Sequence, residues 1–172
     1  MTLFLIGYMG SGKSVIGREL AEILGYNYID FDEFIETQEN ATIKTIFDTK
    51  GEIYFRKAES KYLNAIINLE KTIVSLGGGT PCYGNNMRQI LDSDDSKAIY
   101  LKATIPTLSN RLFDEKSKRP LISHVSSKEL LNEFIGKHLF ERAPFYEQSN
   151  FSIKTDNKSI NEVLEAILLQ LF

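Results

Sequence analysis

One stretch near the start of the chain has the residue types and spacing of a phosphate-binding loop. Residues 7–14 read GYMGSGKS and match the pattern G-x-x-x-x-G-K-[ST] between an apolar segment and a segment with helical spacing. The glycines let backbone N–H groups converge on phosphate oxygens, and the N-terminus of the following helix adds partial positive charge. Lys13 then bridges the outer phosphates, and the Ser14 hydroxyl is a ligand for Mg²⁺. The pattern predicts nucleoside-triphosphate binding; the alternative is a glycine-rich turn.

Two carboxylates follow the second apolar segment, at positions 30 and 32. In an extended backbone, Asp30 and Asp32 project to the same side, and in a parallel sheet this strand end lies beside the phosphate-binding loop. Two carboxylates there can hold a hydrated Mg²⁺ and a substrate hydroxyl. The alternative is a solvated acidic loop, or Asp32 as the N-cap of a helix that begins before Glu33.

Three consecutive glycines end another apolar segment. Residues 73–76 read IVSL and run into Gly77, Gly78 and Gly79. Because three glycines cost backbone entropy, we expect that a sharp turn or the close approach of a ligand requires them. A simple chain reversal is the alternative.

Four arginines are candidates for binding anions: Arg56, Arg111, Arg119 and Arg142. Arg119 lies in the charged segment 114–120, which we expect to be mobile, and a lid arginine places positive charge where a phosphoryl group passes. Arg142 falls on the apolar side of its helix, where an unpaired charge is costly, and an inward-facing Arg56 needs an anion such as a substrate carboxylate. Taken singly, each is equally consistent with a surface or ion-paired arginine.

The elements that must position these residues alternate along the chain. Apolar segments rich in β-branched and aromatic residues occur at 3–6, 28–29, 72–76, 98–101 and 151–153, and segments with helical spacing lie between them. This alternation predicts an α/β fold with a mostly parallel sheet covered by helices on both faces. The longer stretch at 34–68 is expected to form helices beside the sheet.

Helix boundaries follow from caps and apolar spacing. The first helix is expected from Gly12 to Gly25, with an apolar stripe formed by Ile16, Leu20, Ile23 and Leu24. Ser159 with Glu162 predicts a capping box for the last helix. Ser126 with Glu129 predicts another, for a helix that Pro144 kinks or ends.

Composition narrows the class of protein. The 172 residues include 20 Lys and Arg against 23 Asp and Glu, a net charge of −3, which argues against a nucleic-acid partner. With 42% hydrophobic residues the chain is not expected to be disordered, and a single cysteine excludes an internal disulfide. Because we find neither a membrane-crossing run nor a signal peptide, we expect a reduced cytoplasmic protein.

Taken together, these segments resemble the shikimate kinase family of small-molecule kinases. They occur in the family's order and span nearly the whole chain: 7–14 with Ile16 and Gly17, DFD at 30–32, FR at 55–56, LGGG at 76–79, RPL at 119–121 and ERAPFY at 141–146. The resemblance implies a three-layer P-loop kinase fold with five parallel strands in the order 2-3-1-4-5. It implies one domain, 1–172, with a substrate-binding insertion at about 33–68 and a mobile lid at about 112–124.

The same resemblance implies transfer of the γ-phosphoryl group of ATP to the 3-hydroxyl of shikimate, a step of chorismate and aromatic amino acid biosynthesis, with Mg²⁺ as cofactor. The implied catalytic residues are Lys13, Asp32 and Arg119. The implied ATP-binding residues are Gly10, Ser11, Gly12, Lys13, Ser14, Val15 and Arg119, and the implied metal-binding residues are Ser14 and, through water, Asp30. Shikimate binding falls to Asp32, Arg56, Gly77, Gly78, Gly79 and Arg142, with the two arginines clamping the carboxylate.

Several points stay open at this stage. The residues around the adenine are undecided among Arg111, Asn157 and Lys158. A gluconate-type or nucleoside-monophosphate kinase and a non-catalytic nucleotide-binding module remain alternatives. The expected partners are ATP and shikimate alone, without nucleic acid or membrane, for a monomer. We expect Cys82 to be inert, His124 and His138 to hold no metal, and Tyr8 only to cover the phosphate-binding loop.

Overall fold

Five parallel strands form the central sheet of the computed structural model, which describes residues 1–172. The strands are β1 (Thr2–Ile6), β2 (Asn27–Asp30), β3 (Thr72–Ser75), β4 (Ser96–Lys102) and β5 (Phe151–Lys154). Their order is β2-β3-β1-β4-β5, as the family resemblance implied. In register, Phe4 of β1 lies between Val74 of β3 and Ala98 of β4. The phosphate-binding loop therefore leaves the middle of the sheet at its carboxyl edge.

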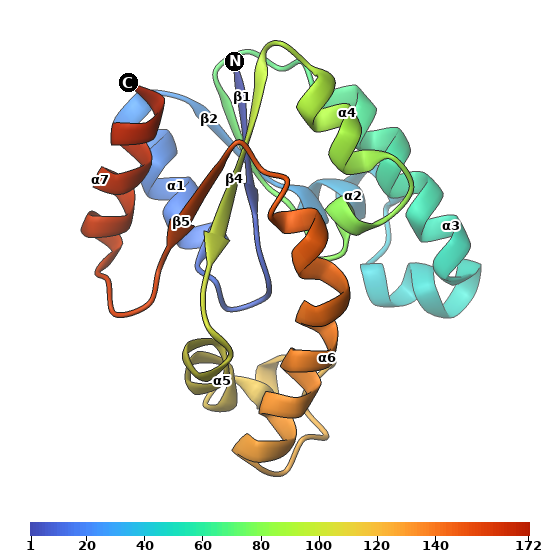
Figure 1. The fold of residues 1–172 in the computed structure, drawn as a ribbon. Coiled ribbons are helices and arrows are strands. Elements are labelled where there is room, and N and C mark those ends of the chain that lie inside the picture. The colour runs from blue at the N-terminus through green and yellow to red at the C-terminus, as the bar shows by residue number, and fades with distance from the viewer.

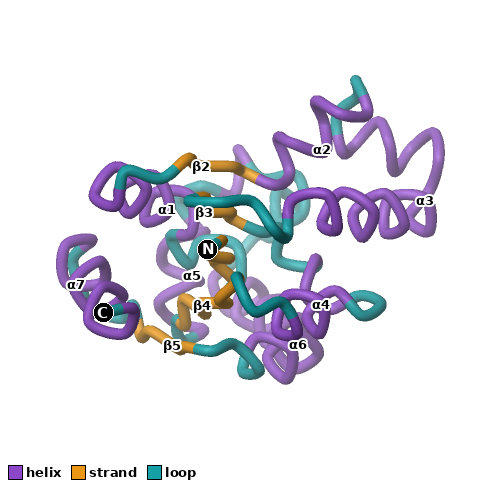
Figure 2. Tube along the Cα trace, turned by 90° about the horizontal axis from the view of Figure 1, so that it is seen from above, coloured by secondary structure: helices purple, strands orange, loops and turns teal.

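Helices cover both faces of the sheet, because side chains of β1 alternate between two apolar cores. Leu3 and Leu5 pack with residues of α1 (Lys13–Leu24) and α7 (Ile160–Leu171). Phe4 and Ile6 pack with residues of the helices on the other face. All four side chains are fully buried, as expected for a parallel sheet between two helix layers. Figures 1 and 2 show α1 and α7 on one side of the sheet and α3, α4 and α6 on the other.

Helix α1 has the predicted ends but a different buried arc. Gly12 (φ 98°) precedes it, and Gly25 (φ 64°) ends it in the left-handed conformation. Ile23 is 54% exposed, so its predicted place in the apolar stripe is wrong. The helix approaches the sheet through Gly17, where a Cβ atom would lie 2.6 Å from the ring of Tyr28, and this contact turns Ile23 to the margin of the interface.

The stretch at 34–68 is helical, as predicted, and stands beside the sheet as α2 (Phe31–Glu39) and α3 (Ile43–Ile66). Gly51 (φ 83°, ψ 170°) interrupts α3. The Glu39 carboxylate accepts hydrogen bonds from Tyr62 (2.7 Å), beyond the interruption, and from Tyr54 (2.8 Å), directly after it. Glu39 therefore fixes α2 to the second part of α3.

The remaining helices close the other face and the carboxyl edge of the sheet. They are α4 (Asn86–Asp92), α5 (Ile105–Phe113), α6 (Lys128–Tyr146) and two 3₁₀ turns, at Thr80–Cys82 and Lys116–Lys118. The predicted capping box of Ser159 and Glu162 is present on α7. That of Ser126 is wrong by one residue, since Ser127 caps α6 by accepting from Leu130 N (3.3 Å). Pro144 lies in the last turn of α6, which ends two residues later.

No helix of the chain has the length and apolarity to span a bilayer.

Candidate active site

The phosphate-binding loop has the form that its sequence predicts. Gly10 (φ 79°) and Gly12 (φ 98°) take backbone conformations that L side chains rarely adopt. The Lys13 ammonium folds back to donate to the carbonyls of Gly7 (2.8 Å) and Tyr8 (3.0 Å). The Ser11 hydroxyl is buried without a hydrogen-bond partner, so the loop keeps a donor for an anion.

The pKa of Lys13 depends on its burial and on the charges around it. Desolvation lowers the pKa of Lys13 to about 8, and the Asp32 carboxylate opposes this shift. Arg119 adds a smaller lowering effect. A neighbouring anion would favour the charged ammonium.

Arg111 ties the loop to the segment in which the sequence left the adenine contact open. Its guanidinium donates to the carbonyl of Gly10 (3.1 Å) and to that of Thr155 (3.3 Å). Asp156 accepts a hydrogen bond from Thr104 N (2.9 Å), and Asn157 has a positive φ of 54°. Arg111 thus connects α5, the phosphate-binding loop and the loop between β5 and α7.

Asp30 and Asp32 meet beside the loop, but not as an extended pair. Strand β2 ends at Asp30, and α2 begins at once, so the predicted extended backbone at position 32 is wrong. Asp30, rather than Asp32, is the N-cap, and its Oδ1 accepts from the backbone N of Asp32 (3.1 Å) and of Glu33 (3.3 Å). This capping favours a helix over a continued strand after Asp30, because it satisfies two of the free N–H groups at the start of α2.

The two carboxylates have separate surroundings. Asp30 Oδ2 faces the Ser14 hydroxyl at 3.5 Å. Burial, and after it the Asp30 and Glu59 carboxylates, raise the pKa of Asp32, and Lys13 opposes them; together they give a pKa of about 6. Asp32 is therefore an acceptor that titrates close to neutral pH.

The oxygen pair of Ser14 and Asp30 fits a magnesium ion by its chemistry. Mg²⁺ prefers hard oxygen ligands and keeps several waters, and it is held in kinases by one or two protein oxygens together with phosphates. An ion at this place would take its remaining ligands from the nucleotide and from water.

The turn at Gly77–Gly79 is where the predicted substrate-binding side chains converge. A Cβ atom on Gly77 would lie 2.7 Å from Asp32 Oδ1, and one on Gly78 would lie 3.1 Å from Arg142 Nη1. A Cβ on Gly79 would lie 2.9 Å from both terminal nitrogens of Arg56. None of the three glycines has a positive φ, so the close approach of side chains, not backbone strain, explains why they are glycine. Three distant segments of the chain therefore meet at one turn.

Arg56 is held by residues that the sequence analysis did not identify. Its Nη1 forms an ion pair with Glu59 at 2.9 Å, and Glu59 is only 1% exposed and also accepts from the Thr80 hydroxyl (2.6 Å). The guanidinium stacks on the ring of Tyr83, 3.8 Å from its centroid. The spacing of three residues between Arg56 and Glu59 on a helix was the available signal for this pair.

Arg142, in contrast, has no acidic side chain within ion-pair distance. Its guanidinium lies 5.8 Å from the ring centroid of Tyr8. Burial raises the pKa of Tyr146, and the nearby Arg142 opposes this rise, while the Tyr146 hydroxyl donates to the Gly78 carbonyl (2.6 Å). Arg142 thus stands among aromatic rings and glycine backbone with its charge uncompensated.

Tyr8 does more than cover the loop, contrary to the expectation from sequence. Its side chain is 1% exposed, and its hydroxyl is hydrogen-bonded to Nδ1 of His138 on α6 (2.8 Å). The sequence carried no signal for this contact, because the two residues are 130 positions apart.

Arg119 and Cys82 occupy the margins of the site. Arg119 is paired with Glu115 at 3.0 Å in the exposed segment after α5, and its side chain is 36% exposed. The Cys82 thiol lies 3.8 Å from the Gly78 carbonyl, and burial raises its pKa to about 11, so the thiol stays protonated.

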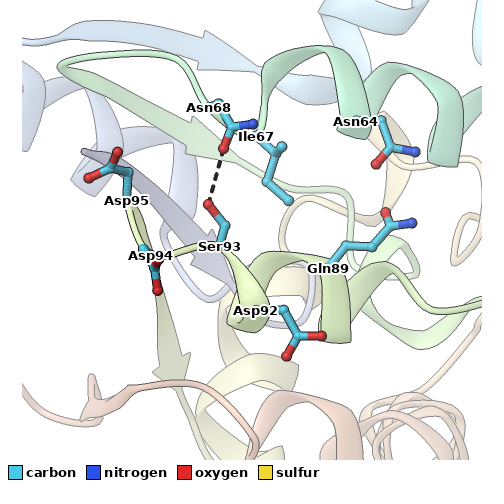
Figure 3. A pocket seen from close by; sticks show the side chains of 8 residues that line it. All are labelled: Asn64, Ile67, Asn68, Gln89, Asp92, Ser93, Asp94 and Asp95. Carbon is cyan, nitrogen blue, oxygen red and sulfur yellow. Dashed lines mark hydrogen bonds between the residues drawn. The ribbon is translucent and has the colours of Figure 1, made fainter.

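Two open grooves lie away from the phosphate-binding loop. One, of about 640 Å³, opens beside Arg56 and includes Tyr83 and Lys57 in its lining. The other, of about 520 Å³, lies at the amino edge of the sheet (Figure 3). It is lined by Asn64, Ile67, Asn68, Gln89, Asp92, Ser93, Asp94 and Asp95. It contains none of the predicted site residues.

Comparison with known proteins identifies relatives along the whole chain. The sequence profile described as shikimate kinase matches residues 9–172. A shikimate kinase of Flavobacterium johnsoniae is 46% identical over 167 residues, which are 96% of this chain and 96% of that protein. A shikimate kinase of Flavobacterium psychrophilum is 42% identical over 171 residues, covering 99% of this chain and 98% of its own.

Solved structures agree with the sequence relatives. The crystal structure of shikimate kinase from Bacteroides thetaiotaomicron superposes with a TM-score of 0.90 at 31% identity, covering 99% of this chain and 98% of that chain. Shikimate kinase from Acinetobacter baumannii in complex with shikimate superposes with a TM-score of 0.84 at 30% identity, covering 99% and 92%. A gluconokinase from Sinorhizobium meliloti, with a TM-score of 0.61 at 17% identity and coverage of 99% and 90%, shares the fold.

Proposed function

The chain belongs to the shikimate kinase family, and from that premise we propose how its own residues carry out the reaction. The reaction is the ATP-dependent phosphorylation of the 3-hydroxyl of shikimate, in the biosynthesis of aromatic amino acids. Shikimate offers one carboxylate and several hydroxyl groups, so its binding site needs fixed cations and an acceptor for hydroxyl protons.

The convergence at Gly77–Gly79 is the observation that carries the proposal. It brings Arg142, Arg56 and Asp32 to adjacent positions along one turn. We assign the shikimate carboxylate to the two guanidinium groups and the shikimate hydroxyls to Asp32, with the glycine backbone forming the floor. Arginine suits this task because its planar fork matches a carboxylate with two parallel hydrogen bonds.

The two arginines differ in the partners that they have before the substrate binds. Arg142 has no acidic partner within ion-pair distance, so its guanidinium can pair with a substrate carboxylate without breaking an existing ion pair. Arg56 already pairs with Glu59, yet its Nε is buried without a hydrogen-bond partner. Glu59 therefore fixes Arg56, and the Glu52 carboxylate lies 3.8 Å from Nε without forming a hydrogen bond to it.

A second group of residues, in and near the phosphate-binding loop, would bind ATP and the transferring phosphoryl group. Lys13, the Ser11 hydroxyl and the loop N–H groups of residues 10–15 would bind the phosphates of ATP. Arg119 would move inward from its pair with Glu115 to the transferring group. Ser14 and Asp30 would hold Mg²⁺, which supplies charge neutralisation of the phosphates.

Asp32 completes the mechanism as an oriented acceptor. With a pKa of about 6 it is largely ionised at neutral pH, and it can position the attacking hydroxyl and take its proton. Because phosphoryl transfer passes through a loose transition state, positioning and charge stabilisation contribute more than basicity.

The same assignment divides the molecule into working parts. The insertion at about 33–68 carries Arg56 and would bind shikimate, and the segment at about 112–124 carries Arg119 and would close as a lid that excludes water. We propose a monomer as the active form. We place the enzyme in the cytoplasm, which supplies its ATP.

An ADP-release assay tests the proposal. Purified enzyme with ATP and Mg²⁺ should turn over shikimate and leave quinate, gluconate and nucleoside monophosphates largely unused. Arg142→Ala should weaken shikimate binding by about 2–4 kcal/mol, since it removes one partner of a desolvated ion pair. An unchanged KM for shikimate in that variant would contradict the carboxylate clamp, and the absence of any single-turnover phosphorylation would contradict the catalytic assignment.

A further inference from the structure

A hydrogen bond joins the phosphate-binding loop to the helix that carries Arg142. The Tyr8 hydroxyl and His138 Nδ1 are 2.8 Å apart, and Tyr8 is almost completely buried. His138 and Arg142 are four residues apart on α6 and therefore lie on the same side of the helix. A constraint on His138 is thus a constraint on the turn of α6 from which Arg142 projects.

The Tyr8 ring also faces the Arg142 guanidinium. The guanidinium carbon lies 5.8 Å from the ring centroid, within the range of a cation–π contact. Arg142 has no acidic partner, so the ring is one of the few groups that restrict its position. The backbone of Tyr8 contacts the ATP side of the site, because its carbonyl accepts a hydrogen bond from Lys13 (3.0 Å), the residue assigned to the phosphates of ATP.

Burial keeps both members of this hydrogen bond uncharged. Burial raises the pKa of Tyr8 to about 12, with Arg142 opposing, so the phenol is neutral. Burial and the Arg142 charge lower the pKa of His138, and Glu141 opposes them. Phe134 packs against the imidazole in a T-shaped arrangement, with ring centroids 4.5 Å apart. The hydrogen bond at neutral pH therefore joins two uncharged groups, the phenol and the imidazole.

We propose that Tyr8 and His138 are positioning residues that hold Arg142 in place for the carboxylate of shikimate. The inference rests on the proposed role of Arg142. A free arginine side chain has many rotamers, and restricting them before the substrate arrives lowers the entropy lost on binding. The hydrogen bond to His138 holds the Tyr8 hydroxyl in place, and the Tyr8 ring is thereby held against the Arg142 guanidinium.

Variants of the hydrogen bond test this role. Tyr8→Phe keeps the ring and removes the hydroxyl, and His138→Leu removes the ring nitrogen that bonds to it. Each should raise the KM for shikimate about fivefold, the factor that one neutral hydrogen bond of ordinary strength supplies, with kcat and the KM for ATP within about twofold of the wild type. His138→Asn, whose amide supplies a polar atom near the position of Nδ1 that can accept or donate, should recover most of the affinity. The double variant should have the same KM for shikimate as either single variant, because both substitutions remove the same hydrogen bond.

Tyr28→Phe is the matched control. It also removes a buried tyrosine hydroxyl, but this hydroxyl has no hydrogen-bond partner. Its KM for shikimate should equal that of the wild type. Thermal unfolding of each variant shows whether it is folded, and if Tyr8→Phe fails to fold, the comparison of His138→Leu with His138→Asn carries the test.

The outcomes separate this inference from the proposed function. If Arg142→Ala raises the KM for shikimate while Tyr8→Phe and His138→Leu do not, the positioning role is refuted and the carboxylate clamp stands. If Tyr8→Phe instead raises the KM for ATP or lowers kcat alone, Tyr8 supports only the phosphate-binding loop, and the inference is overturned. If Arg142→Ala leaves the KM unchanged, the clamp itself fails.

Discussion

Replacing Gly79 with alanine tests how the glycine turn sets the position of Arg56. The backbone at Gly79 has φ −85° and ψ −21°, which alanine adopts without strain. The added methyl group, however, would lie 2.9 Å from both terminal nitrogens of Arg56, whereas ordinary Cβ contacts begin at 3.4 Å. The guanidinium must therefore move by about 0.5 Å.

The expected effect follows from the bonds that this movement stretches. Arg56 Nη1 and Glu59 Oε2 are 2.9 Å apart, and a further half ångström takes this pair out of good hydrogen-bond geometry. The same movement displaces the guanidinium from the position in which it would bind the shikimate carboxylate. A hydrogen bond to a charged group contributes about 1.5–3 kcal/mol, and each 1.4 kcal/mol is about tenfold in affinity. We expect the KM for shikimate to rise about 10- to 100-fold and the KM for ATP to stay within about twofold.

Stability distinguishes this effect from general damage. The pair with Glu59 is also stretched in the free enzyme, so the free energy of unfolding should fall by no more than about 1.5–3 kcal/mol, the contribution of that one bond. Gly136→Ala is the matched control, because the new Cβ would have its nearest neighbour, Ile105 Cδ1, at an ordinary 3.6 Å. ADP release at varied shikimate and thermal unfolding measure both quantities. A folded Gly79→Ala enzyme with the wild-type KM for shikimate would refute the reasoning.

Three further predictions follow from the charges of the structure. Arg119→Ala should lower kcat about a hundredfold or more with the shikimate KM within about threefold, and comparable turnover would remove the lid arginine from the mechanism. Because Asp32 has a pKa of about 6, kcat/KM for shikimate should fall about tenfold per pH unit below about pH 6, and a flat profile between pH 5 and 7 would contradict its role as acceptor. Hydrogen bonds from Tyr62 and Tyr54 lower the pKa of Glu39 to about 2, so its ionised form stabilises the fold above its ordinary pKa, and this contribution is lost as the pH falls toward 2. Glu39→Gln should reduce the free energy of unfolding by about 1 kcal/mol at pH 7 and by less at pH 3, measured by urea titration.

Local features of this chain were readable from sequence because neighbouring residues decide them. The phosphate-binding loop needs eight consecutive residues, and the Ser159–Glu162 capping box needs four. Alternating apolar and helical segments likewise fixed the class of fold. Where two local solutions competed, prediction was wrong: the strand at position 30 gave way to a helix that Asp30 caps, and the cap of α6 fell on Ser127 instead of Ser126.

The geometry of the shikimate side was decided by tertiary structure alone. From sequence, Asp32, Arg56 and Arg142 were separate candidates that resemblance grouped, and only the packing of α2, α3 and α6 around the sheet brings each of them against its own glycine at 77–79. The contact of Tyr8 with His138 joins residues 130 positions apart. Contacts of this kind depend on how whole helices settle on the sheet, and no run of neighbouring residues encodes them.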